Sequence, residues 1–215
     1  MLTTTTEKLL HNARRLREKK FFHQPADMIS VLLPGKASLL LLTPDQVPAQ
    51  YSFADIAAGV LPEQQLDQAR LHAQIYQQRE DVGAIASLSP HWCGALSKLA
   101  EVMPSVFDEH ARHIGRSWRL SNAEQIAAAI SAGGNCGTIG EQLLAMGVTQ
   151  NRMVFNAELF EKCAMAYTLA RTSGQPVKTI PWWVRLIAGK RLKKDQHQAV
   201  VRHQAGLEAE ELKAY

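Results

Sequence analysis

The chain has 215 residues, of which 46% are hydrophobic and 20% are charged, a balance typical of one ordinary globular domain. No apolar run approaches the ~20 residues that a membrane-spanning helix needs, and Met1–Glu7 lacks the basic-then-apolar pattern of a signal peptide. The three cysteines, Cys93, Cys136 and Cys163, form no Cys-x-x-Cys pair. This spacing favours reduced thiols in the cytoplasm over a disulfide framework or a thiolate zinc site.

The net charge of +4 is unevenly distributed along the chain. Residues 1–20 carry six basic and two acidic side chains, and residues 178–215 carry eight basic and four acidic ones. Residues 21–177 carry ten basic and fourteen acidic side chains, so the middle is mildly acidic. Basic ends of this kind are typical of a binding tail or of a solvated face.

The hydrophobic pattern predicts helices and strands that alternate along the chain. A Pro34-Gly35 turn should join two strands, Ser121–Glu124 should form a capping box, and Thr149 should cap a long helix. Because several strands are joined by tight turns, we expect a layered α/β domain with a mixed or largely antiparallel sheet. The predicted helices cover residues 5–20, 63–79, 90–100, 125–132, 150–171 and 184–213, and the predicted strands cover residues 28–33, 38–43, 82–86 and 138–146.

The most informative segment is Ala84–Ser97, which reads Ala-Ile-Ala-Ser-Leu-Ser-Pro-His-Trp-Cys-Gly-Ala-Leu-Ser. It combines an apolar strand, a polar corner and a helix of small residues. It resembles the metal-site segment of the class II aldolase/adducin family, His-x-His-Pro-x-Tyr/Trp-Ala-x-Ala-Leu-Ser. Ser87 and Ser89 stand where that family has two zinc-binding histidines. The flanking residues of the motif are therefore kept, but two of its metal ligands are lost.

Further segments extend the resemblance over about residues 5–178. It implies a three-layer α/β/α domain at residues 1–178. Residues 179–215 lie beyond the resemblance, and their pattern and charge predict a basic helical arm that packs on the same or a neighbouring subunit. The resemblance further implies a homo-oligomer, with a tetramer favoured. The segments, in chain order, are Ala26–Gly35, Leu41–Pro44, Gln68–Asp81, Met103–Glu109 and Gly147–Ala164.

The resemblance also implies a catalytic site that this chain has altered. In the family, three histidines hold a divalent metal, usually zinc, whose open position polarises a substrate carbonyl. The third histidine falls on Glu141 without a gap, or on Cys136 if a gap is allowed. The acid/base carboxylate falls on Gln68, whose amide cannot shuttle a proton at neutral pH. The adjacent Asp67 is turned by ~100° on a helix and should point elsewhere.

The phosphate-binding positions of the sugar-phosphate aldolases are altered as well. The resemblance places them at Ala26-Asp27, at Asp45-Gln46 just after Thr43, and at Leu66-Asp67. Three carboxylates thus replace neutral donors and should repel a phosphate dianion. We therefore expect no sugar phosphate to bind here in the family's way.

Two hypotheses of different class follow. The first is a non-catalytic family member, a pseudoenzyme with a binding or assembly role and no cofactor, in which Ser87 and Ser89 merely cap the helix near Pro90. The second is a divergent metal-dependent lyase, aldolase or epimerase that acts on a small, sugar-like hydroxy-carbonyl compound. Its rebuilt site would draw on Glu141, Asp67 and Asp27 together with His72, and would favour Mg²⁺ or Mn²⁺ over Zn²⁺.

The remaining histidines carry weaker expectations. His72 is also a structural histidine of the family helix, which predicts a core residue. His91 could join a rearranged metal site but is expected to be exposed. His110 and His113, at i and i+3, could share a helical face and bind a metal, although no third ligand is visible.

The stretch Ile180–Lys194 matches nothing in the family. Trp182 and Trp183 open an apolar cluster that is followed by Lys190, Arg191, Lys193 and Lys194. It could dock on a neighbouring subunit with the tryptophans as anchors, which is favoured, or on an unknown protein partner. It could also lie on an anionic membrane. Nucleic-acid binding is not expected, because no recognition motif accompanies the charge.

Overall fold

A seven-stranded sheet forms the centre of the molecule in this computed structural model, which describes residues 2–33, 35, 37–174 and 176–211. The strand order is β3-β2-β1-β4-β7-β6-β5. Every neighbouring pair is antiparallel except β5 and β6, which are parallel. The expected mixed, largely antiparallel sheet is therefore confirmed. The strands are β1 (Met28–Leu32), β2 (Ser38–Leu42), β3 (Ala49–Ser52), β4 (Ala84–Leu88), β5 (Trp118–Leu120), β6 (Cys136–Ile139) and β7 (Gln142–Gly147).

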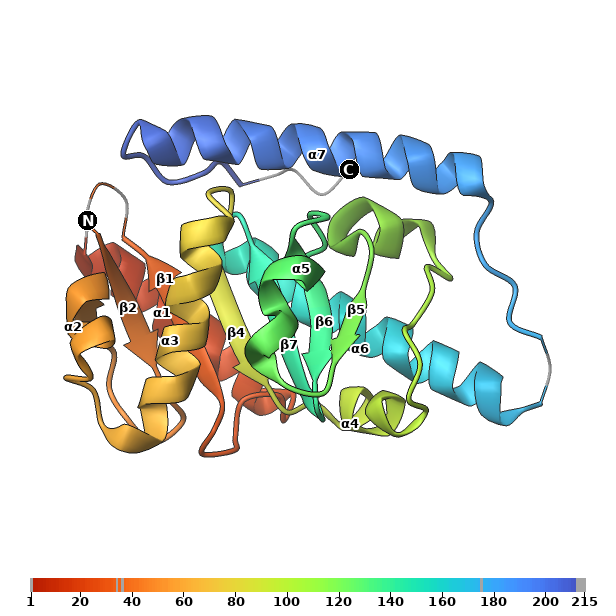
Figure 1. The fold of residues 1–215 in the computed structure, drawn as a ribbon, viewed down its shortest axis with the longest axis horizontal. Helices are drawn as coiled ribbons and strands as arrows, with labels where there is room; N and C mark the ends of the chain where they lie inside the picture. The colour runs from red at the N-terminus through yellow and green to blue at the C-terminus, as the bar shows by residue number, and fades with distance from the viewer. Residues whose placement is uncertain (1, 34, 36, 175, 212–215) are drawn as a thin grey trace.

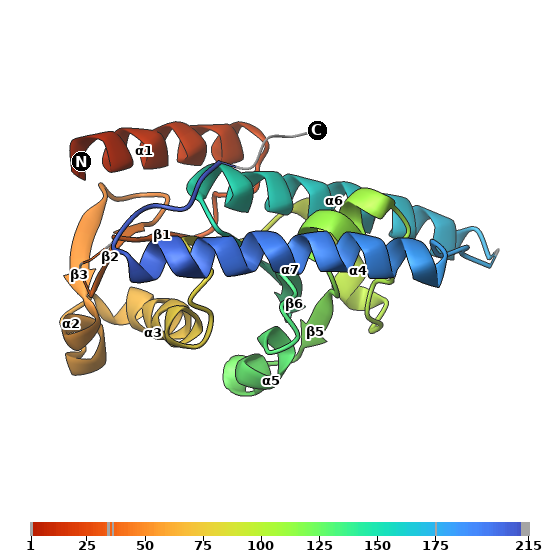
Figure 2. The same cartoon turned by 90° about the horizontal axis from the view of Figure 1, so that it is seen from above.

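Helices cover both faces of the sheet and give the expected three layers (Figures 1 and 2). One apolar core lies between the sheet and the helices α1 (Leu2–Glu18), α4 (His91–Lys98) and α6 (Gln150–Thr172). The other lies beneath α2 (Phe53–Ala58), α3 (Glu63–Gln78) and α5 (Ile126–Ile130). Strand β4 serves both cores, because Ala84, Ala86 and Leu88 face the first and Ile85 faces the second.

Of two helix caps predicted from the sequence, one is confirmed and one is wrong. Thr149 caps α6 as predicted, because its side chain accepts a hydrogen bond from the N–H of Arg152 at 3.2 Å. The capping box at Ser121 is wrong. Asn122 accepts from the N–H of Glu124 instead, at 3.1 Å, and a 3₁₀ turn over Ala123–Gln125 precedes α5. The predicted Pro34-Gly35 turn falls partly on Pro34, outside the described residues.

The C-terminal helix is shorter than predicted. Helix α7 spans Trp182–Gln204, and Gly206 then adopts a left-handed φ of 71°, which ends the helix. The chain returns to α1, where Glu208 accepts from Thr5 at 3.3 Å and Glu211 pairs with Lys8 at 2.7 Å. None of the helices in the described residues is long and apolar enough to span a membrane.

Candidate functional site

The position that the resemblance assigns to a metal ligand at Ser87 lies where α3 covers strands β1 and β4. Strand register aligns Met28 with Ser87 and Ser30 with Ile85. Met28 and Ile85 belong to the core beneath α3, so Ser30 and Ser87, two residues further along their strands, share that face. On α3, His72 and Tyr76 are one turn apart, and His72 reaches both serines while Tyr76 reaches Ser30.

His72 links the two strands through both ring nitrogens. Its Nδ1 lies 2.9 Å from the hydroxyl of Ser30, and its Nε2 lies 2.9 Å from the hydroxyl of Ser87. Ser87 donates its single proton to Oε1 of Gln68 at 3.0 Å, so it accepts from Nε2–H. Nδ1 consequently accepts from Ser30, which defines a neutral imidazole with its proton on Nε2.

Burial keeps this network uncharged. His72 is fully buried, and burial lowers its pKa to about 3, so the ring is neutral at pH 7. Tyr76 donates its O–H to the carbonyl of Ser30 at 3.0 Å, and burial raises the pKa of this phenol above its usual value. The expectation that His72 is a core residue therefore agrees with its position in the structure.

Two glutamines extend the network. Gln68 donates to Oε1 of Gln142 at 2.8 Å, and Gln142 donates to the carbonyl of Ala26 at 3.1 Å. Glu141, the neighbour of Gln142 in the turn between β6 and β7, is exposed and makes no hydrogen bond or ion pair with any described residue. Sequence counting singled out Glu141, but Gln142 is the side chain of this turn that enters the site. Successive side chains at the start of a strand point to opposite sides, and a one-residue displacement therefore changes the ligand.

The second serine, Ser89, belongs to a separate group around a buried carboxylate. Its hydroxyl donates to Oδ1 of Asp27 at 2.7 Å, while Oδ2 accepts the backbone N–H groups of His23 and Gln24 at 2.8 Å each. Asp27 is fully buried. Its oxygens thus hold the loop before β1, a structural task.

The expectation that Ser87 and Ser89 cap α4 is wrong. No side chain of the preceding corner caps this helix; instead Glu161 of α6 accepts the N–H groups of Trp92 at 2.7 Å and Cys93 at 2.9 Å. Burial raises the pKa of Glu161, and these two hydrogen bonds partly oppose the shift. Local sequence could not reveal this cap, because it comes from a helix far along the chain.

A shallow groove remains at the family's anion-binding positions. Its volume is about 430 Å³, and Thr43 and Asp45 line it together with Ala26 and Gln46. Asp67 is exposed on α3, and the groove's lining does not include it. The groove therefore contains one predicted carboxylate, Asp45, and no cationic side chain.

The other predicted ligands lie apart. His91 is exposed with its ring edge against Trp92, and Cys136 is buried in the core. His110 pairs with Ser117 at 2.8 Å, whereas His113 accepts from Arg152 at 2.9 Å. Across the residues that the structure describes, no three His, Cys, Asp or Glu side chains gather as a metal site.

Comparison with known proteins places this geometry in a family. Residues 14–168 match the family model described as Class II Aldolase and Adducin N-terminal domain. Comparison with curated proteins gave no match.

Solved structures share the fold. L-fuculose 1-phosphate aldolase from Glaciozyma antarctica PI12 is 18% identical, with a TM-score of 0.67 and 96% of this chain and 92% of that chain covered. An aldolase II superfamily protein from Pseudomonas syringae is 16% identical, with a TM-score of 0.68 and 96% and 94% covered. YgbL from Escherichia coli is 15% identical, with a TM-score of 0.70 and 86% and 98% covered. At these identities the likeness concerns the fold alone.

Proposed function

Because this chain belongs to the class II aldolase and adducin family, we propose that it is a non-catalytic member with a binding or assembly role. One observation carries the proposal: the buried His72 and Ser87 and the half-buried Gln68 form a neutral hydrogen-bond network at the positions that the resemblance assigns to the metal and the base. Their remaining polar atoms bond to Ser30 and Gln142. A network of this kind stabilises the fold and offers no acid or base near neutral pH.

The residues present do not fit the zinc ion that the family implies. Zinc in proteins takes imidazole, thiolate or carboxylate ligands. The two ligand positions carry hydroxyls that are already engaged, Ser87 with His72 and Gln68 and Ser89 with Asp27. Glu141 is exposed, away from the network. No catalytic step through a metal is therefore derived for this chain.

A divergent metal-dependent lyase or epimerase for a small hydroxy-carbonyl compound is the second candidate. The groove lined by Thr43 and Asp45 favours this candidate, because it is an opening that a small substrate could enter. Such an enzyme would need Glu141, Asp67 and His72 to act together. In the structure two of these are exposed and the third is buried and neutral.

Metal content separates the two candidates. We expect the untagged protein, purified without chelator, to contain no stoichiometric divalent ion by inductively coupled plasma mass spectrometry, and to bind no Zn²⁺ or Mn²⁺ on re-addition. The variant Ser87→His/Ser89→His/Gln142→His should gain about one equivalent of Zn²⁺ per chain, because the frame would again present three imidazoles. Stoichiometric metal in the unmodified protein, lost in Glu141→Ala, would favour the enzyme instead.

An assembly role requires contacts between copies, and we propose a homo-oligomer, with a tetramer as the favoured state. The support is family membership together with the exposed apolar start of α7 at Trp182, Trp183, Leu186 and Ile187. Light scattering coupled to size-exclusion chromatography tests this, with four copies expected and a monomer as the contrary result.

A further inference from the structure

Helix α7 is fixed to the body of the molecule by its middle and its end. Ala188, Leu192 and Ala199 of this helix are buried. Leu192 packs so closely on Gly115 that a Cβ added to the glycine would lie 2.9 Å from Cδ2 of Leu192. Arg112 forms an ion pair with Asp195. Figures 1 and 2 show α7 running along one edge of the molecule, across the ends of the strands.

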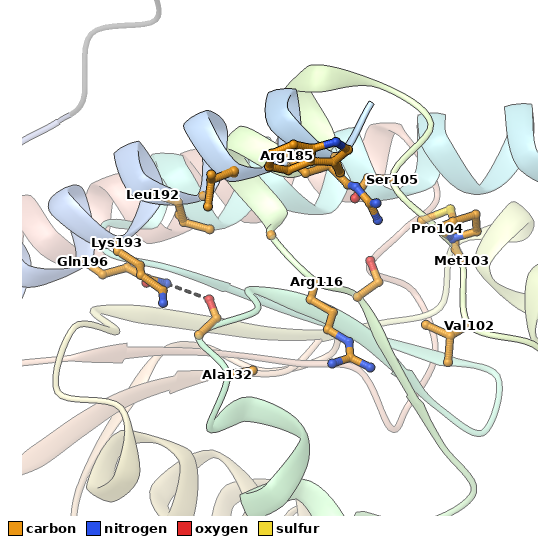
Figure 3. A pocket seen from close by; sticks show the side chains of 17 residues that line it. Val102, Met103, Pro104, Ser105, Arg116, Ala132, Arg185, Leu192, Lys193 and Gln196 are labelled. Carbon is orange, nitrogen blue, oxygen red and sulfur yellow. Dashed lines mark hydrogen bonds between the residues drawn. The ribbon is translucent and has the colours of Figure 1, made fainter. Parts of the chain in front are cut away.

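The first half of α7 forms one wall of a groove of about 730 Å³ (Figure 3). The facing wall consists of residues 102–105 and 115–117. The two walls are tied at both ends of the groove. The N–H of Ile180 donates to the carbonyl of Ser105 at 3.2 Å, and the Gln196 amide donates to the carbonyl of Gly133 at 2.8 Å. The groove is therefore a built feature, not a gap beneath a loose helix.

All charges that line this groove are positive. Arg116, Arg185 and Lys193 line it, and its lining includes no carboxylate. The side chains of these three residues make no hydrogen bond or ion pair within the described residues, whereas nearby Arg112 is paired with Asp195. Unpaired cations around a concave surface raise the local concentration of anions and strengthen any charge-assisted hydrogen bond formed there.

The rest of the lining is mainly apolar. Met103 is buried, and Leu186, Leu192 and Trp182 add aliphatic and aromatic surface. Figure 3 shows Met103 and Leu192 on opposite sides of the groove, with Arg185 extending from α7 toward Ser105. The volume lies within the range of small-molecule sites, which combine apolar walls with a few polar groups.

A second hollow continues the groove past Arg116. Its volume is about 390 Å³, and it shares Val102, Arg116 and Ser117 with the first. Arg119 also lines it, and its Nε is buried with no hydrogen-bond partner among the described residues. Arg116 thus stands between two hollows that both present a guanidinium without a counter-charge.

We propose that this groove binds a small amphipathic anion, with a carboxylate or phosphate held by Arg116 and Arg185 and an apolar body against Met103, Leu192 and Trp182. The concave shape and the tied walls favour a small molecule over a flat membrane surface. Trp183, Ile187 and Lys190, which a membrane would also need, do not line the groove. The proposal is independent of whether the old metal site is catalytic.

Calorimetric titration of the full chain with decanoate tests it. We expect one site per chain, with decanoate binding at least about tenfold more tightly than decan-1-ol, which lacks the charge, or acetate, which lacks the apolar body. Arg116→Gln and Arg185→Gln should each weaken binding about tenfold, the order of one charge-assisted hydrogen bond. Lys190→Gln, on α7 but outside the groove lining, is the matched control and should leave binding unchanged.

Three results would overturn the proposal. One is absence of decanoate binding, or equal binding of decan-1-ol. Another is an equal loss in Lys190→Gln, which would show a diffuse charge effect. The third is capture by phosphatidylcholine–phosphatidylglycerol vesicles that requires Trp183 and Lys190 but not Arg116, since the helix would then serve a membrane.

Discussion

Two regions of the molecule have opposite characters: the side chains around the end of β4, and the groove beside the first part of α7. At the end of β4, Ser87 bonds to His72 in one buried network, and Ser89 bonds to Asp27 in a separate group. In the groove beside the first part of α7, Arg116, Arg185 and Lys193 lack partners among the described residues, and Trp182 and Trp183 are 69% and 53% exposed. The first region lies within the family match at residues 14–168, and α7 lies beyond it. Under the proposed non-catalytic role, the first region stabilises the fold, while the groove beside α7 presents cations for binding.

The largest expected effect is at the network. His72→Ala should lower the free energy of unfolding by about 3–5 kcal/mol, because it opens a cavity and leaves Ser30 and Ser87 without their buried partner. Urea denaturation measures the loss, and the exposed His91→Ala should cost less than about 0.5 kcal/mol. A cost below about 1 kcal/mol at His72 would contradict a structural network.

The next effect tests the cap that links α4 to α6. Glu161→Ala should cost about 2–3 kcal/mol, since the N–H groups of Trp92 and Cys93 lose a charged acceptor. Glu109→Ala, which removes an exposed pair with Lys162, should cost less than about 1 kcal/mol in the same assay. Equal costs for the two variants would show that Glu161 does not secure α4.

Acid should weaken the region around the end of β4. The folded pKa of His72, about 3, lies below its unfolded value of 6.5, so the unfolded chain binds more protons in this window. This contribution is complete above pH 6.5 and is lost as the pH falls toward 3. Between pH 7 and pH 5 it amounts to about 2 kcal/mol.

Measuring the free energy of unfolding against pH in the wild type and in His72→Gln isolates the contribution of His72. His110, whose pKa is also lowered by burial, to about 4, remains in both proteins. We expect a smaller loss of stability in the variant between pH 7 and pH 5. Parallel curves would mean that His72 titrates normally.

The smallest effect is expected on α7. Trp183→Ser and Ile187→Ser remove exposed side chains and should each change the stability of the chain by less than about 0.5 kcal/mol. Urea denaturation at low protein concentration makes the comparison. A cost above about 2 kcal/mol that disappears on dilution would mean that another copy buries this face, as the proposed oligomer requires. A cost that persists on dilution would mean that these side chains pack within the single chain.

Sequence patterns predicted a layered sheet and most elements, because an apolar run marks the buried strand β4 and the Thr149 cap marks the start of α6. They missed contacts made across the fold. Gln142 enters the site in place of Glu141 because a one-residue displacement in a strand reverses the side chain. Glu161 caps α4 from a distant helix, and no local signal marks it. The groove beside α7 depends on how that helix is docked, which composition does not determine.

The most direct test of the account is nuclear magnetic resonance of the His72 ring in the folded protein. We predict a neutral imidazole with its proton on Nε2 that persists as the pH is lowered to about 5, and no change in its signals when Zn²⁺ is added. A ring that titrates near pH 6.5, or whose nitrogen signals move on addition of Zn²⁺, would contradict the proposal that this site is a structural network.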